Sequence, residues 1–190
     1  MEPTNPTGLL AAAEHTGRDR LVAAIGVAGA VAVFLSHRAT PVTAVGLVVV
    51  VAVSTWLSII DFREHRLPNQ IVGPLAVAVT VAVIVGSLIE DDLWRGGRAV
   101  GFGLAVTAIL LLANVLGGMG MGDVKYGFPW ATTIGWFGWP PLSIAIMVTT
   151  ISGALVAVAV LIGRRSGDES LSYGPYMALG LIGGLLAAAL

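Results

Sequence analysis

The sequence of 190 residues contains no cysteine and few charged residues. The absence of cysteine excludes disulfides, a thiolate nucleophile and the usual cysteine-rich zinc site. His15, His37 and His65 lie far apart along the chain, so we expect no histidine-based metal site. Only 11% of the residues are charged and the net charge is −1, which argues against nucleic acid as a partner. We therefore expect the protein to work without a metal or another cofactor.

The chain is instead rich in hydrophobic residues, which make up 56% of it. Uncharged stretches of about 20 residues indicate membrane-spanning helices, because the bilayer offers no water to unpaired backbone groups. The predicted fold class is all-α, a polytopic integral membrane helix bundle of about seven transmembrane helices. We expect a cytoplasmic N-terminal tail over residues 1–20 and a single transmembrane domain over residues 21–190. The expected spans are Leu21–Ser36, Arg38 to Asp61, Ile71 to Glu90, Arg98 to Asp123, two within Tyr126–Gly163, and Leu171–Leu190.

A run of glycine and proline divides the long uncharged stretch from Tyr126 to Gly163. Proline disfavours helix in the residue before it, and tryptophan suits a membrane interface. Gly138-Trp139-Pro140-Pro141 is therefore predicted to turn the chain between the fifth and sixth spans.

The distribution of lysine and arginine predicts the orientation of the bundle, because cytoplasmic segments carry an excess of both. A cytoplasmic N-terminus gives seven basic residues inside: Arg18, Arg20, Arg63, Arg66, Lys125, Arg164 and Arg165. It leaves three outside: Arg38, Arg95 and Arg98. Two spans separate Asp61 from Asp123, so both aspartates are expected on the cytoplasmic side.

Asp61 follows an apolar helix end, where a carboxylate is costly. An ionisable residue at membrane depth indicates a functional site. The alternative is an interfacial acid that pairs with Arg63 or Arg66. Asp123 ends the run Gly117-Gly118-Met119-Gly120-Met121-Gly122, whose glycines predict irregular backbone beside a wet cleft. Together the two aspartates suit acid–base peptide hydrolysis, in which paired carboxyls share one proton.

Other residues of the sequence have structural interpretations, beside or in place of a functional one. Lys125 suits either a charge that biases the carboxyl pair or a snorkelling anchor. Arg66, Pro68 and Asn69 indicate an exposed turn before the third span. Asn114 is predicted to hydrogen-bond a neighbouring helix, and Gly153 with Ala157 to pack against one. Tyr173, Gly174 and Pro175 interrupt the start of the last span, either lining the cleft or forming an interfacial kink.

Three sequence blocks resemble the type IV prepilin peptidases, which with the preflagellin peptidases are GxGD membrane aspartyl proteases. The blocks are Ile60-Asp61 with Arg66-Leu67-Pro68-Asn69, then Gly118-Met119-Gly120-Met121-Gly122-Asp123-Val124-Lys125, then Leu171-Ser172-Tyr173-Gly174-Pro175-Tyr176. The family usually has Pro-Phe-Gly-Pro where this chain has Ser172-Tyr173-Gly174-Pro175. The resemblance runs from about Val51 to the C-terminus.

This resemblance implies Asp61 and Asp123 as the catalytic pair, with Gly120 and Gly122 as supporting motif residues. It implies cleavage of a positively charged leader from prepilin or pseudopilin precursors, at the cytoplasmic face of a bacterial plasma membrane. The family's bifunctional members also N-methylate the product, often with paired Cys-x-x-Cys motifs in an extra N-terminal region. This chain has neither, so N-methyltransferase activity is not expected. A short form that serves a Flp-like pilus or a related secretion pseudopilus fits better. The alternatives are a presenilin-like protease that cuts within the membrane and a non-catalytic transporter or assembly subunit.

Overall fold

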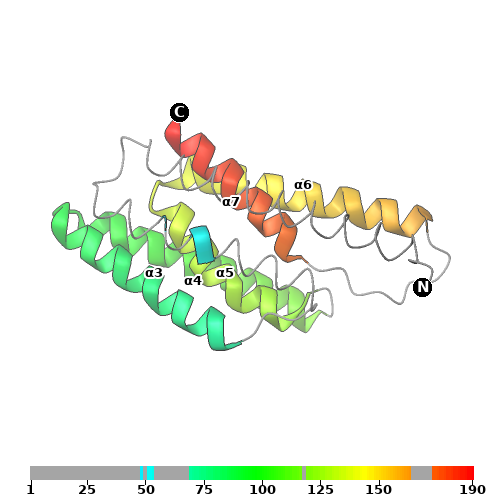
Figure 1. Cartoon of the computed structure of the whole chain (residues 1–190), viewed down its shortest axis with the longest axis horizontal. Helices are drawn as coiled ribbons and strands as arrows, with labels where there is room; N and C mark the ends of the chain where they lie inside the picture. Colours follow the sequence, from blue (N-terminus) through cyan, green and yellow to red (C-terminus); the bar gives the residue numbers. More distant parts are fainter. Residues whose placement is uncertain (1–47, 49–50, 54–68, 117–118, 164–172) are drawn as a thin grey trace, which may run out of the picture.

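The computed structural model describes residues 48, 51–53, 69–116, 119–163 and 173–190, which contain helices and no strand. Five helices account for most of these residues (Figure 1). They are α3 (Asn69–Ile89), α4 (Leu93–Val115), α5 (Met121–Gly135), α6 (Trp139–Gly163) and α7 (Gly174–Ala189). The all-α class is confirmed for this part of the chain. The expected tail and most of the first two spans lie outside the described residues.

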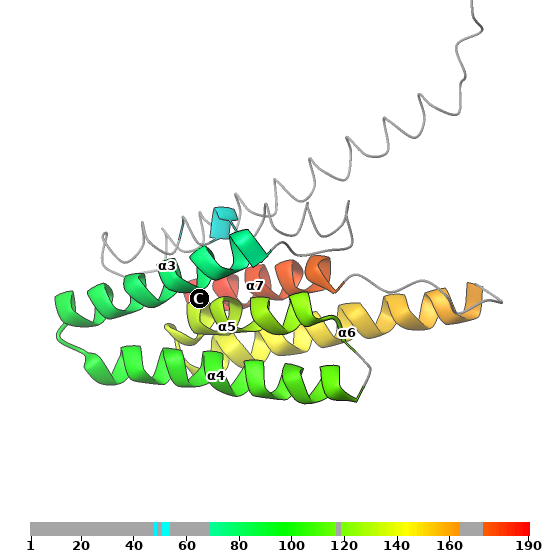
Figure 2. The same ribbon diagram turned by 90° about the horizontal axis from the view of Figure 1, so that it is seen from below.

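The helices form two antiparallel hairpins, α3 with α4 and α6 with α7, and α5 lies between them (Figure 1). Helix α5 packs against all four of the others, whereas the two hairpins meet through side chains, such as the rings of Phe102 on α4 and Trp139 on α6, whose centroids lie 5.8 Å apart. Since successive helices alternate in direction, the start of α5 lies at the same end of the bundle as the end of α4 and the start of α7 (Figure 2). Helix α3 also begins on that side.

The central helix α5 is much more buried than its neighbours. Eleven of the 15 residues of α5 are buried, which is typical of a helix that is enclosed on all sides. Helices α3, α4 and α6 instead expose many large apolar residues, such as Ile109 and Leu155. Three segments are long and apolar enough to cross a membrane, Ile71–Ile89, Leu93–Val115 and Trp139–Val158, and α7 is a shorter apolar helix. The described residues thus support a multi-pass membrane protein and leave the count of seven spans a prediction.

The start of α4 differs from the expected start after Arg98. Helix α4 begins at Leu93, so Arg95 and Arg98 lie inside its first two turns. Asp92 caps the helix by accepting a hydrogen bond from the Arg95 backbone N–H at 2.9 Å. The Arg95 side chain pairs with Glu90 and lies over the Trp136 ring, 4.5 Å from its centroid. These contacts compensate the charge of Arg95 within the helix. The prediction that the span starts after Arg98 was therefore wrong.

The predicted turn around Gly138 is confirmed, although its two sides are unequal. Helix α5 ends at Gly135 and α6 begins at Trp139, with Gly138 at a φ of 107° that favours glycine. Pro140 and Pro141 lie in the first turn of α6, where a missing N–H costs little. The two helices have 15 and 25 residues, rather than about 19 each. Only the second is long enough to count as a span.

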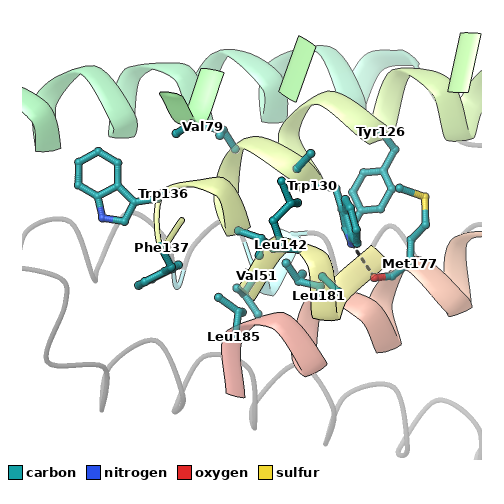
Figure 3. Packing of buried hydrophobic residues seen from close by; sticks show 14 of the residues in the cluster. Val51, Val79, Tyr126, Trp130, Trp136, Phe137, Leu142, Met177, Leu181 and Leu185 are labelled. Atoms are coloured by element: carbon teal, nitrogen blue, oxygen red, sulfur yellow. Dashed lines mark hydrogen bonds between the residues drawn. The ribbon is translucent and has the colours of Figure 1, made fainter. Parts of the chain in front are cut away.

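Small residues allow the helices to approach closely, as expected where lipid tails supply no hydrophobic force between helices. A Cβ added at Gly103 of α4 would lie 2.0 Å from the Thr132 Oγ1 of α5. A Cβ at Gly180 of α7 would lie 1.9 Å from the Thr149 Oγ1 of α6. Between α5 and α7, Trp130 Nε1 donates a hydrogen bond to the Met177 carbonyl oxygen at 2.7 Å (Figure 3). These contacts fix α5 against the helices on both of its sides.

Candidate active site around Asp123

Asp123 lies in the first turn of α5, and its side chain is buried, with 8% exposed. The irregular backbone predicted for its glycine run is therefore wrong at Met121 and Gly122, which are helical. Glycine weakens a helix by about 1 kcal/mol relative to alanine, and packing on all sides of α5 outweighs that loss. The start of a helix carries unpaired N–H groups and a partial positive charge. An ionised carboxylate is favourable there, despite its burial.

The backbone before Asp123 is held by two local contacts. Gly120 is the N-cap of α5, and a Cβ there would lie 3.3 Å from the Asp123 Oδ2. The carboxylate is thus folded back over the helix start. Asn114, near the end of α4, donates a hydrogen bond from Nδ2 to the Met119 carbonyl oxygen at 2.6 Å. Asn114 therefore anchors the connection before Asp123, rather than joining two helices as its position in an apolar span predicted.

Tyr173, the N-cap residue of α7, lies between α6 and the Asp123 carboxylate. Its hydroxyl and the Thr150 side chain form a hydrogen bond, and the negative charge of Asp123 acts on it. Gly153, one turn after Thr150, makes room for the ring, because a Cβ there would lie 3.0 Å from the Tyr173 Cε2. Thr150 and Gly153 together form a seat on α6 for this tyrosine. The seat brings the phenol of the third motif block toward the carboxylate of the second.

Burial raises the pKa of the half-buried Tyr173 phenol above its usual value, and the Asp123 charge acts in the same direction. The hydrogen bond with Thr150 acts in the opposite direction, to a smaller extent than burial. A raised pKa means that the phenol keeps its proton at neutral pH. Tyr173 therefore presents a neutral hydroxyl group beside the carboxylate.

We predict that Asp123→Asn lowers the pKa of Tyr173 and leaves it above the usual value, because the negative charge is lost and the burial remains. The measurement is an NMR titration of the protein in detergent micelles with ring-labelled tyrosine. Tyr173→Phe assigns the signal among the three tyrosines of the chain. An unchanged pKa in Asp123→Asn would show that the two side chains do not interact.

A cavity of about 160 Å³ lies beside Tyr173. Its floor is formed by the buried side chains of Trp130 and Met177. Residues of four helices line it: Val106, Ile109, Leu110, Trp130, Ile146, Thr149, Thr150, Tyr173 and Met177. Ile109 and Thr150 are exposed, so the cavity has an accessible rim as well as a buried floor. The arrangement combines an apolar pocket with one buried carboxylate.

The remaining predicted site residues that the structure describes lie around this end of the bundle. Gly122 is half-buried in the first turn of α5, and Lys125 is exposed on the same helix. Gly174 is buried at the start of α7, with Pro175 in the first turn. Asn69 is the first residue of α3. Asp61, Arg66 and Pro68 lie outside the described residues, so their positions stay predictions.

Two residues of the site, Thr150 and Trp130, could not be predicted as site residues from the sequence. Thr150 carries no charge and lies in an apolar span, where a lone threonine usually bonds its own helix. Trp130 lies within the expected fifth span, where an indole suggests only packing. Gly153 belongs to a Gly-x-x-x-Ala pair, which predicts a helix contact but not its partner. Thr150 and Gly153 meet Tyr173 because α6 packs against α7, and Trp130 joins the pocket from α5.

Comparison with known proteins covers the first two sequence blocks. Residues 48–161 match the model of the type IV leader peptidase family. This range contains both Asp61 and Asp123. Curated relatives with the name prepilin leader peptidase/N-methyltransferase occur in several bacteria. The one from Stutzerimonas stutzeri is 30% identical over 138 residues, which cover 66% of this chain and 45% of that protein.

Two further relatives bear the same name. The protein of Escherichia coli K12 is 28% identical over 169 residues, which cover 88% of this chain and 73% of the relative. That of Pseudomonas putida is 32% identical over 132 residues, which cover 66% of this chain and 45% of the relative. The chain thus spans less than half of the length of two of these three relatives. No solved structure matches it.

Proposed function

Because the chain belongs to the type IV leader peptidase family, we propose that it is a membrane aspartyl endopeptidase. Its substrates are type IV prepilin-like precursors, Flp/Tad-type precursors among them, and it removes their positively charged leader peptides. The single observation that carries this proposal is the buried Asp123 carboxylate at the start of the central helix. An apolar pocket and the Tyr173 hydroxyl lie beside it.

Asp61 is the proposed second carboxyl of the catalytic pair. Helix α3 begins on the side of the bundle where α5 begins (Figure 2), and only eight positions separate Asp61 from Asn69. An extended chain of that length reaches at most about 28 Å, which is compatible with the proposed position of Asp61 beside Asp123. The order of the blocks in the sequence is compatible with a meeting of the two carboxyls.

The proposed mechanism uses the two carboxyls in different protonation states. The ionised carboxyl removes a proton from a water molecule as its oxygen attacks the carbonyl carbon of the scissile peptide. The protonated carboxyl donates a hydrogen bond to the carbonyl oxygen, which develops negative charge. The carbon–nitrogen bond then breaks, and the departing amine takes a proton from a carboxyl. The pair shares one proton again when the products leave.

The position of Asp123 favours leader cleavage over cleavage within a membrane helix. Asp123 lies beyond the last residue of α4, Val115, and in the first turn of α5, so it is at an end of the bundle rather than in its middle. We propose that this end faces the cytoplasm of a bacterium with the protein in its plasma membrane. A precursor whose leader is cytoplasmic and whose next segment is apolar then meets the site at the boundary between the two.

The proposal is tested by incubating the protein, purified in a bilayer-like environment, with a prepilin-like precursor. We expect a product that lacks the leader, identified from its mass and its new N-terminus. The control is the same precursor with the leader lysines and arginines replaced by glutamate, which we expect to be cleaved more slowly. A cut inside the apolar segment would instead favour an intramembrane protease. Intact precursors of every pilin class, with folded protein present, would contradict the proposal.

A further inference from the structure

The cavity beside Tyr173 has the chemistry of a pocket for one apolar side chain. Its floor combines the Trp130 indole with the thioether of Met177, which adapts readily to the shape of an apolar guest. Val106 and Ile146 form parts of its walls from two different helices. The buried indole N–H of Trp130 already donates a hydrogen bond to the Met177 carbonyl oxygen, so it does not require an acceptor from a bound side chain.

The size of the cavity limits what it can hold. Its volume of about 160 Å³ is close to that of an engineered apolar cavity of about 150 Å³ that binds benzene. One aromatic ring or one branched aliphatic side chain therefore fills it. An extended acyl chain of a phospholipid is longer than the cavity, because membrane lipids span about half of a hydrocarbon core of ~30 Å.

Tyr173 connects the cavity with the candidate active site. This residue lines the cavity, and its phenol also experiences the charge of Asp123. Met177 lies four residues after Tyr173, so the floor is about one helical turn, ~5.4 Å, farther along α7. That separation is within the reach of a single side chain whose backbone lies at the carboxylate.

We infer that this cavity is a specificity pocket for one large apolar side chain of the substrate, next to the bond that is cut. The inference rests on the proposed peptidase function and adds the residues that bind the side chain of the substrate. Val106, Ile146, Trp130 and Met177 enclose the side chain, and Tyr173 separates it from the carboxylate. The apolar side chain belongs to the start of the substrate's membrane segment, which enters the pocket as the charged leader stays outside.

The first test narrows the pocket and asks whether specificity changes. Ile146→Phe adds volume inside the cavity, whereas Met147→Phe adds an aromatic ring at the next residue of α6, which is 59% exposed and does not line the cavity. Two precursors are compared, with phenylalanine or alanine as the first residue after the cut. We expect Ile146→Phe to lower the phenylalanine-to-alanine ratio of kcat/KM by about 10-fold or more. Met147→Phe should leave the ratio unchanged.

The second test does not require turnover and so stays informative if Ile146→Phe fails to fold. The chain has no cysteine, so a single introduced cysteine gives crosslinking without background. Ile146→Cys should form a disulfide with a precursor that carries cysteine as the first residue after the cut, and Met147→Cys should not. Equal crosslinking at both positions, with an unchanged ratio of kcat/KM, would overturn the pocket while leaving the peptidase function intact. Absence of cleavage by the parent protein would instead contradict the peptidase function.

Discussion

Replacement of Asp123 by asparagine is expected to reduce leader cleavage at least about 100-fold, the scale of a lost general acid or base. Asparagine has nearly the same shape and can keep the contacts at the start of α5, but it neither takes nor gives a proton. Asp61→Asn should have an effect of the same size, because the proposed reaction needs both carboxyls. The measurement is the initial rate of precursor cleavage by purified variants, normalised to the amount of folded protein.

The matched control for this prediction is Asp91→Asn. Asp91 lies between α3 and α4, at the opposite end of the bundle, with a φ of 53° that asparagine also tolerates. The substitution Asp91→Asn removes one carboxylate that is remote from the candidate site, so the rate of cleavage should equal that of the parent protein. Full activity in Asp123→Asn, together with folded protein, would exclude Asp123 from the chemistry.

Gly103→Ala is expected to have the second large effect, on stability. The added Cβ would lie 2.0 Å from the Thr132 Oγ1 and 3.0 Å from the Phe128 carbonyl oxygen, so the Thr132 side chain must rotate and α4 and α5 must shift slightly apart. Overpacking of this kind typically costs about 1–3 kcal/mol. The midpoint of thermal unfolding in detergent should fall, and cleavage should fall with it because α5 carries Asp123.

Gly101→Ala supplies a matched control two residues away on α4. A Cβ at Gly101 meets nothing within 4 Å, and alanine is a better helix former by up to about 1 kcal/mol. The midpoint should therefore stay constant or rise. Thr132→Ala should partly rescue Gly103→Ala, since it removes the closer contact and leaves the carbonyl. Equal midpoints for Gly101→Ala and Gly103→Ala would contradict the close approach of α4 and α5.

Charge and proline patterns were sufficient to predict some helix limits. The third span was expected from Ile71 to Glu90, and α3 runs over Asn69–Ile89, because charged groups mark its outer end. The turn at Gly138 is predictable because proline disfavours helix in the residue before it, and the structure adds that Gly138 has a positive φ. These features are local, so the residues themselves determine the outcome.

Features that depend on tertiary packing were not predictable from the sequence. The glycines around Asp123 favour irregular backbone in isolation, and only enclosure by four helices makes α5 helical from Met121. The seat of Tyr173 on Thr150 and Gly153 joins residues about 20 positions apart in different helices. No local pattern marks that contact. The proposed pairing of Asp61 with Asp123 is also long-range, and it stays a prediction.

The shortness of the central helix has a consequence for the supply of water. Fifteen residues of α5 extend about 22 Å, whereas the hydrocarbon core of a bilayer is ~30 Å thick. Helices α4 and α6, with 23 and 25 residues, are long enough to cross it completely. The middle of the bundle is thus too short for the membrane that its outer helices cross. We expect solvent and lipid headgroups to dip toward the start of α5, so that the water consumed in hydrolysis reaches Asp123 without crossing the hydrocarbon.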